Sequence, residues 1–187
     1  MSEILLHPLY AISGISGSGK TTLGKQLIAI FPEMKHIDQD QYYLKKKPQV
    51  TLSDGKKAFN WDCLEALDPA FKEIIRKESV LHPVLLTGFA LCREVLPVVP
   101  KIHIHLVTTD NPKYLELYCR EARKKKVFNP ERDALVVREL VIPFYYKMIQ
   151  GSDISHNLSV YSNDGTRIPL QRLVSAVSKL ISDSRLV

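Results

Sequence analysis

The stretch from Gly14 to Thr21 constrains this chain more than any other part of it. It reads Gly-Ile-Ser-Gly-Ser-Gly-Lys-Thr and fills every fixed position of the pattern G-x-x-x-x-G-K-[ST]. An apolar run over 9–13 precedes it and helical spacing over 21–31 follows it, so strand, turn and helix come in the order that a phosphate-binding loop requires. A glycine-rich and serine-rich turn that happens to precede a helix is the alternative interpretation.

Each residue type in this loop suits a triphosphate. Glycines let the backbone N–H groups approach phosphate oxygens, and the start of the following helix adds the positive end of its dipole. Lys20 can reach the terminal phosphates, and the Thr21 hydroxyl can ligate magnesium. We therefore expect Lys20 to be catalytic, Thr21 to bind the metal, and the triphosphate to contact Gly14, Ser16, Gly17, Ser18, Gly19, Lys20, Thr21 and Thr22.

Composition places the chain among globular proteins of one domain, spanning 1–187. Its 187 residues are 45% hydrophobic and 25% charged, and no apolar run is long enough to cross a bilayer. No basic region precedes the apolar residues near the N-terminus, so we predict a cytoplasmic protein without a membrane partner. The three cysteines are far apart and odd in number, which favours neither a disulfide framework nor a zinc site.

The net charge of +6 suits nucleic acid and phosphorylated small molecules equally well. The excess of lysine and arginine is local, at 45–47, 56–57 and 120–126, which flank the places where phosphates would lie. No recognised nucleic-acid motif is present, so we predict a small-molecule partner and no nucleic acid.

Strand-like and helix-like segments alternate along the chain, which predicts an α/β fold with a five-stranded parallel sheet flanked by helices. The expected strands are 9–13, 34–37, 84–87, 102–108 and 158–162, and the expected helices are 21–31, 62–77, 112–125, 131–149 and 169–182. Pro143 should kink or split the fourth helix. The lysine-rich stretch 45–59 is expected to be an exposed and mobile connection.

Two further motifs carry candidate chemistry. In 36–43, Asp38 and Asp40 follow a short strand, and a carboxylate there could take a proton from a hydroxyl or hold magnesium through water. Helix capping or a solvated loop end explains them equally well. In 59–68, Asn60 or Asp62 could cap a helix, and Trp61 could belong to the core; alternatively, Trp61 stacks on a planar base while Asp62 accepts hydrogen bonds from ribose hydroxyls.

These motifs resemble the uridine kinase and nicotinamide riboside kinase group of P-loop nucleoside kinases, and the nicotinamide riboside kinases most closely. The resemblance covers nearly the whole length. It is carried by the loop GISGSGKTT, by IDQDQYY at 37–43, WDCLEAL at 61–67, LLTGFAL at 85–91 and VYSNDGT at 160–166.

The resemblance implies roles for individual residues. Asp40 matches the base toward the ribose 5′-hydroxyl, which also supports the metal, and Asp62 matches the residue that binds the ribose hydroxyls. Trp61 sits where an aromatic ring stacks on the base, Phe128 is similar to the ring on the other side, and Arg123 is similar to an arginine that contacts the ribose. The basic segment within about 120–135 would be a lid that closes over the phosphates.

One position departs from the family pattern. Where the nicotinamide riboside kinases have a glutamate that supports magnesium, this chain has Thr87. The implied activity is transfer of the γ-phosphoryl group of ATP, with Mg²⁺, to the 5′-hydroxyl of a nucleoside by a monomer or homodimer. Nicotinamide riboside is the favoured acceptor, which would make nicotinamide mononucleotide for NAD biosynthesis. Uridine or cytidine and, after them, pantothenate are alternatives, and Thr87 leaves open a nucleotide-binding regulatory protein with weakened chemistry.

Overall fold

A central parallel sheet organises the protein. The computed structural model describes residues 6–109, 111, 115–116, 119, 130–162 and 164–186. The strands are β1 (Leu9–Gly14), β2 (Lys35–Asp38), β5 (Val84–Gly88), β6 (Ile102–Val107) and β7 (His156–Ser159), in the order β2-β5-β1-β6-β7. Every neighbouring pair in this sheet is parallel, which confirms the predicted five-stranded parallel sheet. The carboxyl ends of these strands meet at one edge, where β1 runs into the phosphate loop.

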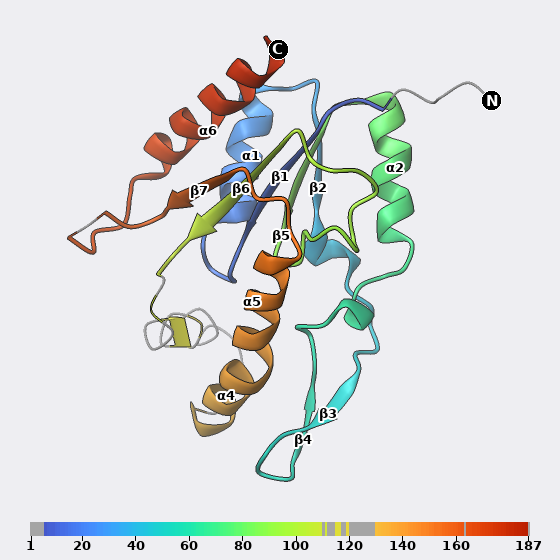
Figure 1. Ribbon diagram of the computed structural model, residues 1–187, viewed down its shortest axis with the longest axis vertical. Coiled ribbons are helices and arrows are strands. Elements are labelled where there is room, and N and C mark those ends of the chain that lie inside the picture. Colours follow the sequence, from blue (N-terminus) through green and yellow to red (C-terminus); the bar gives the residue numbers. More distant parts are fainter. Residues whose placement is uncertain are drawn as a thin grey trace.

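Helices cover both faces of the sheet (Figure 1). On one face, α1 (Lys20–Ile30) and α6 (Leu170–Arg185) pack against the side chains of Tyr10 and Ile12. On the other face, α2 (Phe71–Leu81) and α5 (Ile142–Gln150) pack against Leu9 and Ala11. Because successive strand residues face opposite sides, β1 contributes to both hydrophobic cores and is buried along its whole length. None of the described helices combines the length and the apolar character needed to span a bilayer.

Pro143 splits the helix predicted over 131–149. The structure has α4 (Pro130–Val136), a π-helical turn η3 (Val137–Val141) and then α5, with Pro143 in the first turn of α5. Proline has no N–H to donate, and its ring would collide with a carbonyl one turn earlier, so a regular α-helix cannot pass through it. The helix predicted over 112–125 lies mostly outside the described residues.

The helix predicted over 62–77 is wrong in its first half. Only a short 3₁₀ turn, η2 (Leu64–Ala66), forms there, and α2 begins at Phe71. Pro69 disfavours helical geometry at Asp68, and the backbone before it pairs elsewhere: Leu44 N donates to Ala66 O and Asp68 N donates to Tyr42 O, each at 2.8 Å. Asp62 therefore does not cap an α-helix.

The connection predicted over 45–59 is instead an antiparallel hairpin of β3 (Gln49–Thr51) and β4 (Lys57–Phe59). Gly55 turns the chain with a φ of 78°. The hairpin lies at the end of the molecule where α4 is found (Figure 1). Ser53 N donates to Glu139 Oε2 of η3 at 3.0 Å, and the Arg132 guanidinium of α4 donates to Lys57 O. The hairpin and the α4–η3 segment are thus tied together below the sheet.

Candidate active site

The phosphate loop joins β1 to α1 and has the backbone that its sequence predicts. Gly14, Gly17 and Gly19 have φ values of 152°, 84° and 97°, which residues with a side chain rarely adopt. A Cβ atom at Gly14 would also lie 2.9 Å from the Leu106 carbonyl oxygen. Only glycine fits at this first position, so the chain turns tightly out of the sheet and into the helix.

Lys20 places a buried positive charge at the start of α1. Its side chain is 7% exposed, and its Nζ donates to Ile15 O at 3.0 Å. Burial lowers the pKa of Lys20, while the nearby carboxylates of Asp40 and Asp38 raise it in part. Neither carboxylate forms an ion pair with Lys20, and no other described residue does. A glycine loop with a buried ammonium inside it fits a triphosphate.

A 3₁₀ turn carries the two acidic residues to this loop. β2 ends at Asp38, whose Oδ1 accepts from Asp40 N at 3.3 Å and so caps η1 (Gln39–Tyr42). Buried Gln39 fixes the turn to the segment after β5, since its Nε2 donates to Ala90 O at 2.9 Å and its Oε1 accepts from Ala90 N at 2.8 Å. Gly88 makes room, because a Cβ there would lie 2.6 Å from Gln39 Oε1. Asp40 is left exposed, and it lies close enough to Lys20 to raise the pKa of the lysine.

The backbone pairing of 42–44 with 66–68 brings Asp62 toward Asp40. Burial raises the pKa of Tyr43, and the charges of Asp40 and Asp62 raise it further, so both carboxylates lie near one tyrosine. Trp61 is 51% exposed, which excludes it from the core and leaves it available as an aromatic surface. Arg123 and Phe128 lie outside the described residues.

Thr87 stands where the family pattern has an acidic residue, and its hydroxyl does not face the proposed metal site. Thr87 is fully buried, its Oγ1 lies 3.0 Å from His36 Nε2, and it packs beneath Gly24 of α1. Among the described residues, no three histidine, cysteine or acidic side chains cluster to hold a metal. Magnesium usually keeps several waters and takes phosphate oxygens, so Thr21 with Asp40 is a donor set that fits it.

A cavity of about 280 Å³ adjoins the loop on the α6 side. It is lined by Ser18, Gly19, Thr22, Arg167, Ile168, Pro169, Leu170 and Leu173. Apolar walls with one arginine suit the flat base of a nucleotide whose phosphates enter the loop. Our sequence reasoning missed Arg167, although the stretch just before it contributed to the resemblance.

A larger cavity, of about 590 Å³, lies between η2, α2 and the segment after β5. Among the described residues, Glu65, Asp68 and Glu94 line it together with one cation, Lys72. Three acidic groups around one lysine repel phosphate, so the smaller cavity is the better nucleotide site.

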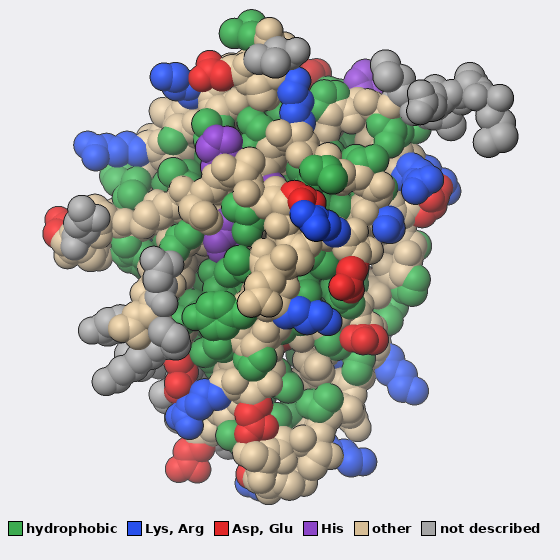
Figure 2. Space-filling view, in the orientation of Figure 1, with side chains coloured by type: hydrophobic (Ala, Val, Ile, Leu, Met, Phe, Trp, Pro, Cys, Tyr) green, Lys and Arg blue, Asp and Glu red, His purple; other side chains and the backbone are tan. Residues whose placement is uncertain are grey.

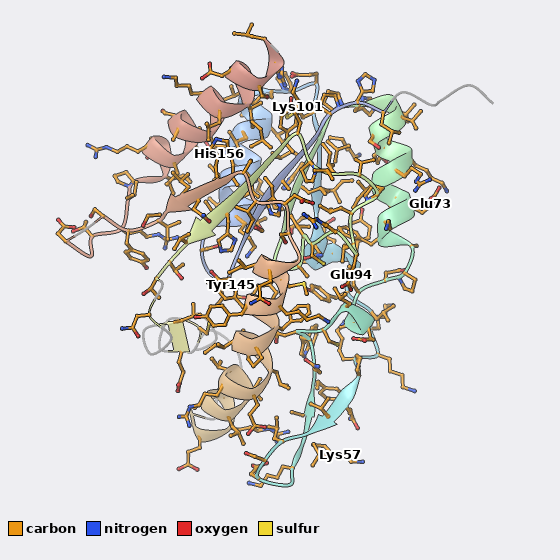
Figure 3. All side chains as sticks on the ribbon, viewed as in Figure 1. Lys57, Glu73, Glu94, Lys101, Tyr145 and His156 are labelled. Carbon is orange, nitrogen blue, oxygen red and sulfur yellow. The ribbon has the colours of Figure 1, made fainter. Side chains whose placement is uncertain are left out.

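Two buried histidines lie directly behind the loop, and sequence reasoning missed them too. His103 and His105 alternate along β6, and Ser13 Oγ lies 2.8 Å from His103 Nε2 and 3.0 Å from His105 Nδ1. His105 Nε2 lies 2.8 Å from the hydroxyl of Tyr145 on α5, labelled in Figure 3. Burial lowers the pKa of each histidine to about 4, helped at His105 by the charge of Lys20. The alternation Ile-His-Ile-His-Leu in the sequence is the signal that could have revealed them.

No family model matches the chain. A uridine kinase of Ureaplasma parvum serovar 3 is 24% identical over 192 residues, covering 87% of this chain and 91% of its own. The nicotinamide riboside kinase of Saccharomyces cerevisiae is 40% identical over 60 residues, which is 32% of this chain and 25% of its own.

Among solved structures, a protein of Silicibacter sp. TM1040, crystallised as a candidate fructose transport system kinase, superposes with a TM-score of 0.57 at 13% identity. The match covers 84% of this chain and 93% of that one, and it confirms the fold. The glycine loop, the buried lysine and the parallel sheet are those of a P-loop kinase fold, and the chain is similar to uridine kinases over most of its length and to nicotinamide riboside kinases over about a third of it.

Proposed function

We propose that this protein transfers the γ-phosphoryl group of ATP to the 5′-hydroxyl of a nucleoside. One observation carries the proposal: the buried ammonium of Lys20 sits inside the glycine loop without an ion pair to another described residue, and the exposed carboxylate of Asp40 lies close to it. A cation for the phosphates beside a base for the acceptor is the arrangement that phosphoryl transfer needs.

The residues have separate tasks in this reaction. The loop amides and Lys20 hold the phosphates, and Asp40 orients the acceptor hydroxyl. As the new bond forms between the acceptor oxygen and the γ-phosphorus, Asp40 takes the hydroxyl proton, the bond to the β-phosphate oxygen breaks, and ADP leaves. Thr21 and Asp40 would hold Mg²⁺, which neutralises charge on the phosphates when bound.

The acceptor would lie on the Asp62 side of Asp40. There Asp62 would accept hydrogen bonds from ribose hydroxyls, and the half-exposed ring of Trp61 would stack on the base. Nicotinamide riboside is our first candidate, with uridine and cytidine next, since proteins with both kinds of name are among the relatives. In Figure 2, acidic and basic side chains are interspersed on the face shown, which supports a small-molecule acceptor over nucleic acid.

A panel of nucleosides, assayed for ADP formation with ATP and Mg²⁺, tests the proposal. At least one nucleoside should be phosphorylated, and Asp40→Ala should slow the best of them by about 100-fold or more, because removal of a general base usually costs that much. Turnover within tenfold of wild type in this variant would contradict the role of Asp40.

A nucleotide-binding regulatory protein is the second candidate, favoured by the burial of Thr87 where the family pattern has an acidic residue. Tight ATP binding in calorimetry, with no turnover on any nucleoside in the panel, would support this function instead.

A further inference from the structure

The hairpin places a lysine against the tryptophan of the acceptor side. In the β3–β4 ladder Gln49 pairs with Phe59, and the pairing continues outward because Asn60 N donates to Pro48 O at 2.8 Å. The next pair in this register is Lys47 with Trp61. Cross-strand partners have neighbouring side chains, and the Lys47 Nζ lies over the Trp61 ring, 4.3 Å from its centroid.

Lys47 is buried, and no described residue gives it a partner of opposite charge. Its side chain is 8% exposed, although lysine is rarely buried unless a carboxylate or another acceptor neutralises it. Its contacts within the described part of the chain are two aromatic rings, Trp61 and Tyr43, the latter at 5.7 Å. Aromatic faces hold a cation but leave its N–H groups without an acceptor. An anion supplied by a ligand would complete this site.

The position of Lys47 links it to the acceptor. Tyr43, which Lys47 contacts, is the tyrosine whose pKa Asp40 and Asp62 raise. The two carboxylates proposed to bind the acceptor hydroxyls and the ammonium of Lys47 therefore all lie within electrostatic reach of Tyr43. An acceptor that reaches Asp62 with its ribose would bring its base close to Lys47.

We infer that Lys47 determines acceptor specificity and that the preferred acceptor carries a carboxylate on its base. The inference rests on the proposed nucleoside kinase function. A carboxylate would form a charge-assisted hydrogen bond with the ammonium, whereas a carboxamide or a plain ring would leave the buried charge unpaired.

Matched ligand pairs test this inference. Nicotinate riboside and nicotinamide riboside differ only in carboxylate against carboxamide, and 5-carboxyuridine differs from uridine only by its carboxylate. Binding is followed by tryptophan fluorescence, since Trp61 is the sole tryptophan of the chain and lies at the proposed contact. Turnover of each ligand with ATP is measured separately.

Three variants complete the experiment. Lys47→Met keeps a long unbranched side chain and removes the charge, Lys47→Arg keeps the charge, and Lys46→Met removes a charge from the neighbouring, exposed lysine as a control. In wild type, Lys46→Met and Lys47→Arg, the carboxylated member of at least one pair should bind about tenfold tighter or more than its partner. Lys47→Met should bind both members equally.

Equal binding of both members in wild type, or a carboxylate preference that survives in Lys47→Met, would overturn the role of Lys47. The proposed function is judged by turnover alone. Phosphorylation without a carboxylate preference refutes only the inference, and a Lys47-dependent preference without phosphorylation refutes only the kinase activity.

Discussion

Lowering the pH from 7 to 5 should destabilise the folded protein through His103 and His105. Both are buried, with a pKa of about 4 in the folded chain against an ordinary value of 6.5. Between these values the unfolded chain binds protons that the folded chain does not, so the free energy of unfolding falls as the pH falls from 6.5 toward 4. At pH 5 the loss is about 2 kcal/mol for each histidine and about 4 kcal/mol for the pair. The total free energy of unfolding of a typical domain is only about 5–15 kcal/mol.

Urea denaturation followed by circular dichroism at pH 7, 6 and 5 measures this loss. A variant with His103→Asn and His105→Gln should show a much flatter dependence on pH, while His82→Gln, which alters an exposed histidine, should behave like wild type. Proton NMR of the wild-type histidine rings gives a second readout, because the two buried rings should not titrate above pH 5. Equal losses in wild type and in the double variant, or buried rings that titrate near pH 6.5, would refute the reasoning.

The remaining predictions concern the loop and its support. Lys20→Met should weaken ATP binding by about 10- to 100-fold in calorimetry, since a charge-assisted contact with phosphate is lost; unchanged affinity would contradict the site. Gly24→Ala should lower stability by about 1–3 kcal/mol in urea denaturation, because its Cβ would lie 2.7 Å from Thr87 Cγ2 and 2.8 Å from His36 Nε2. Thr87→Glu should lower the melting temperature without strengthening Mg²⁺ binding, because this position faces α1. Tighter Mg²⁺ binding at an unchanged melting temperature would mean that the position faces the metal site instead.

The sheet and the loop could be predicted because their signals are local. The run Val84 to Leu86 is apolar throughout because the strand is buried on both faces, and the loop motif fixes its own backbone. The hairpin gave a weaker signal, since each of its strands is only three residues long. Its turn, Ser53-Asp54-Gly55, was nevertheless visible in the sequence.

Other features depend on contacts between distant segments. The helix expected from residue 62 begins only at Phe71, because Tyr42 and Leu44 pair with the segment that precedes it. That pairing joins residues more than twenty positions apart, so no local propensity reveals it. Lys47 stands in a run of three lysines, and the sequence does not distinguish it from its exposed neighbours. Only the hairpin register, set by Gln49 and Phe59, places it on Trp61.

The double hydrogen bond between Gln39 and Ala90 has a consequence for how such a protein could diversify. It anchors the turn bearing Asp40 to the segment after β5, whereas Lys47 adjoins the hairpin, which is tied to α4 and η3 through Arg132 and Glu139. The proposed catalytic carboxylate and the proposed specificity residue are therefore held in place by different parts of the fold. Replacing the hairpin could change which acceptor the protein binds, while Asp40 and the phosphate loop keep their positions.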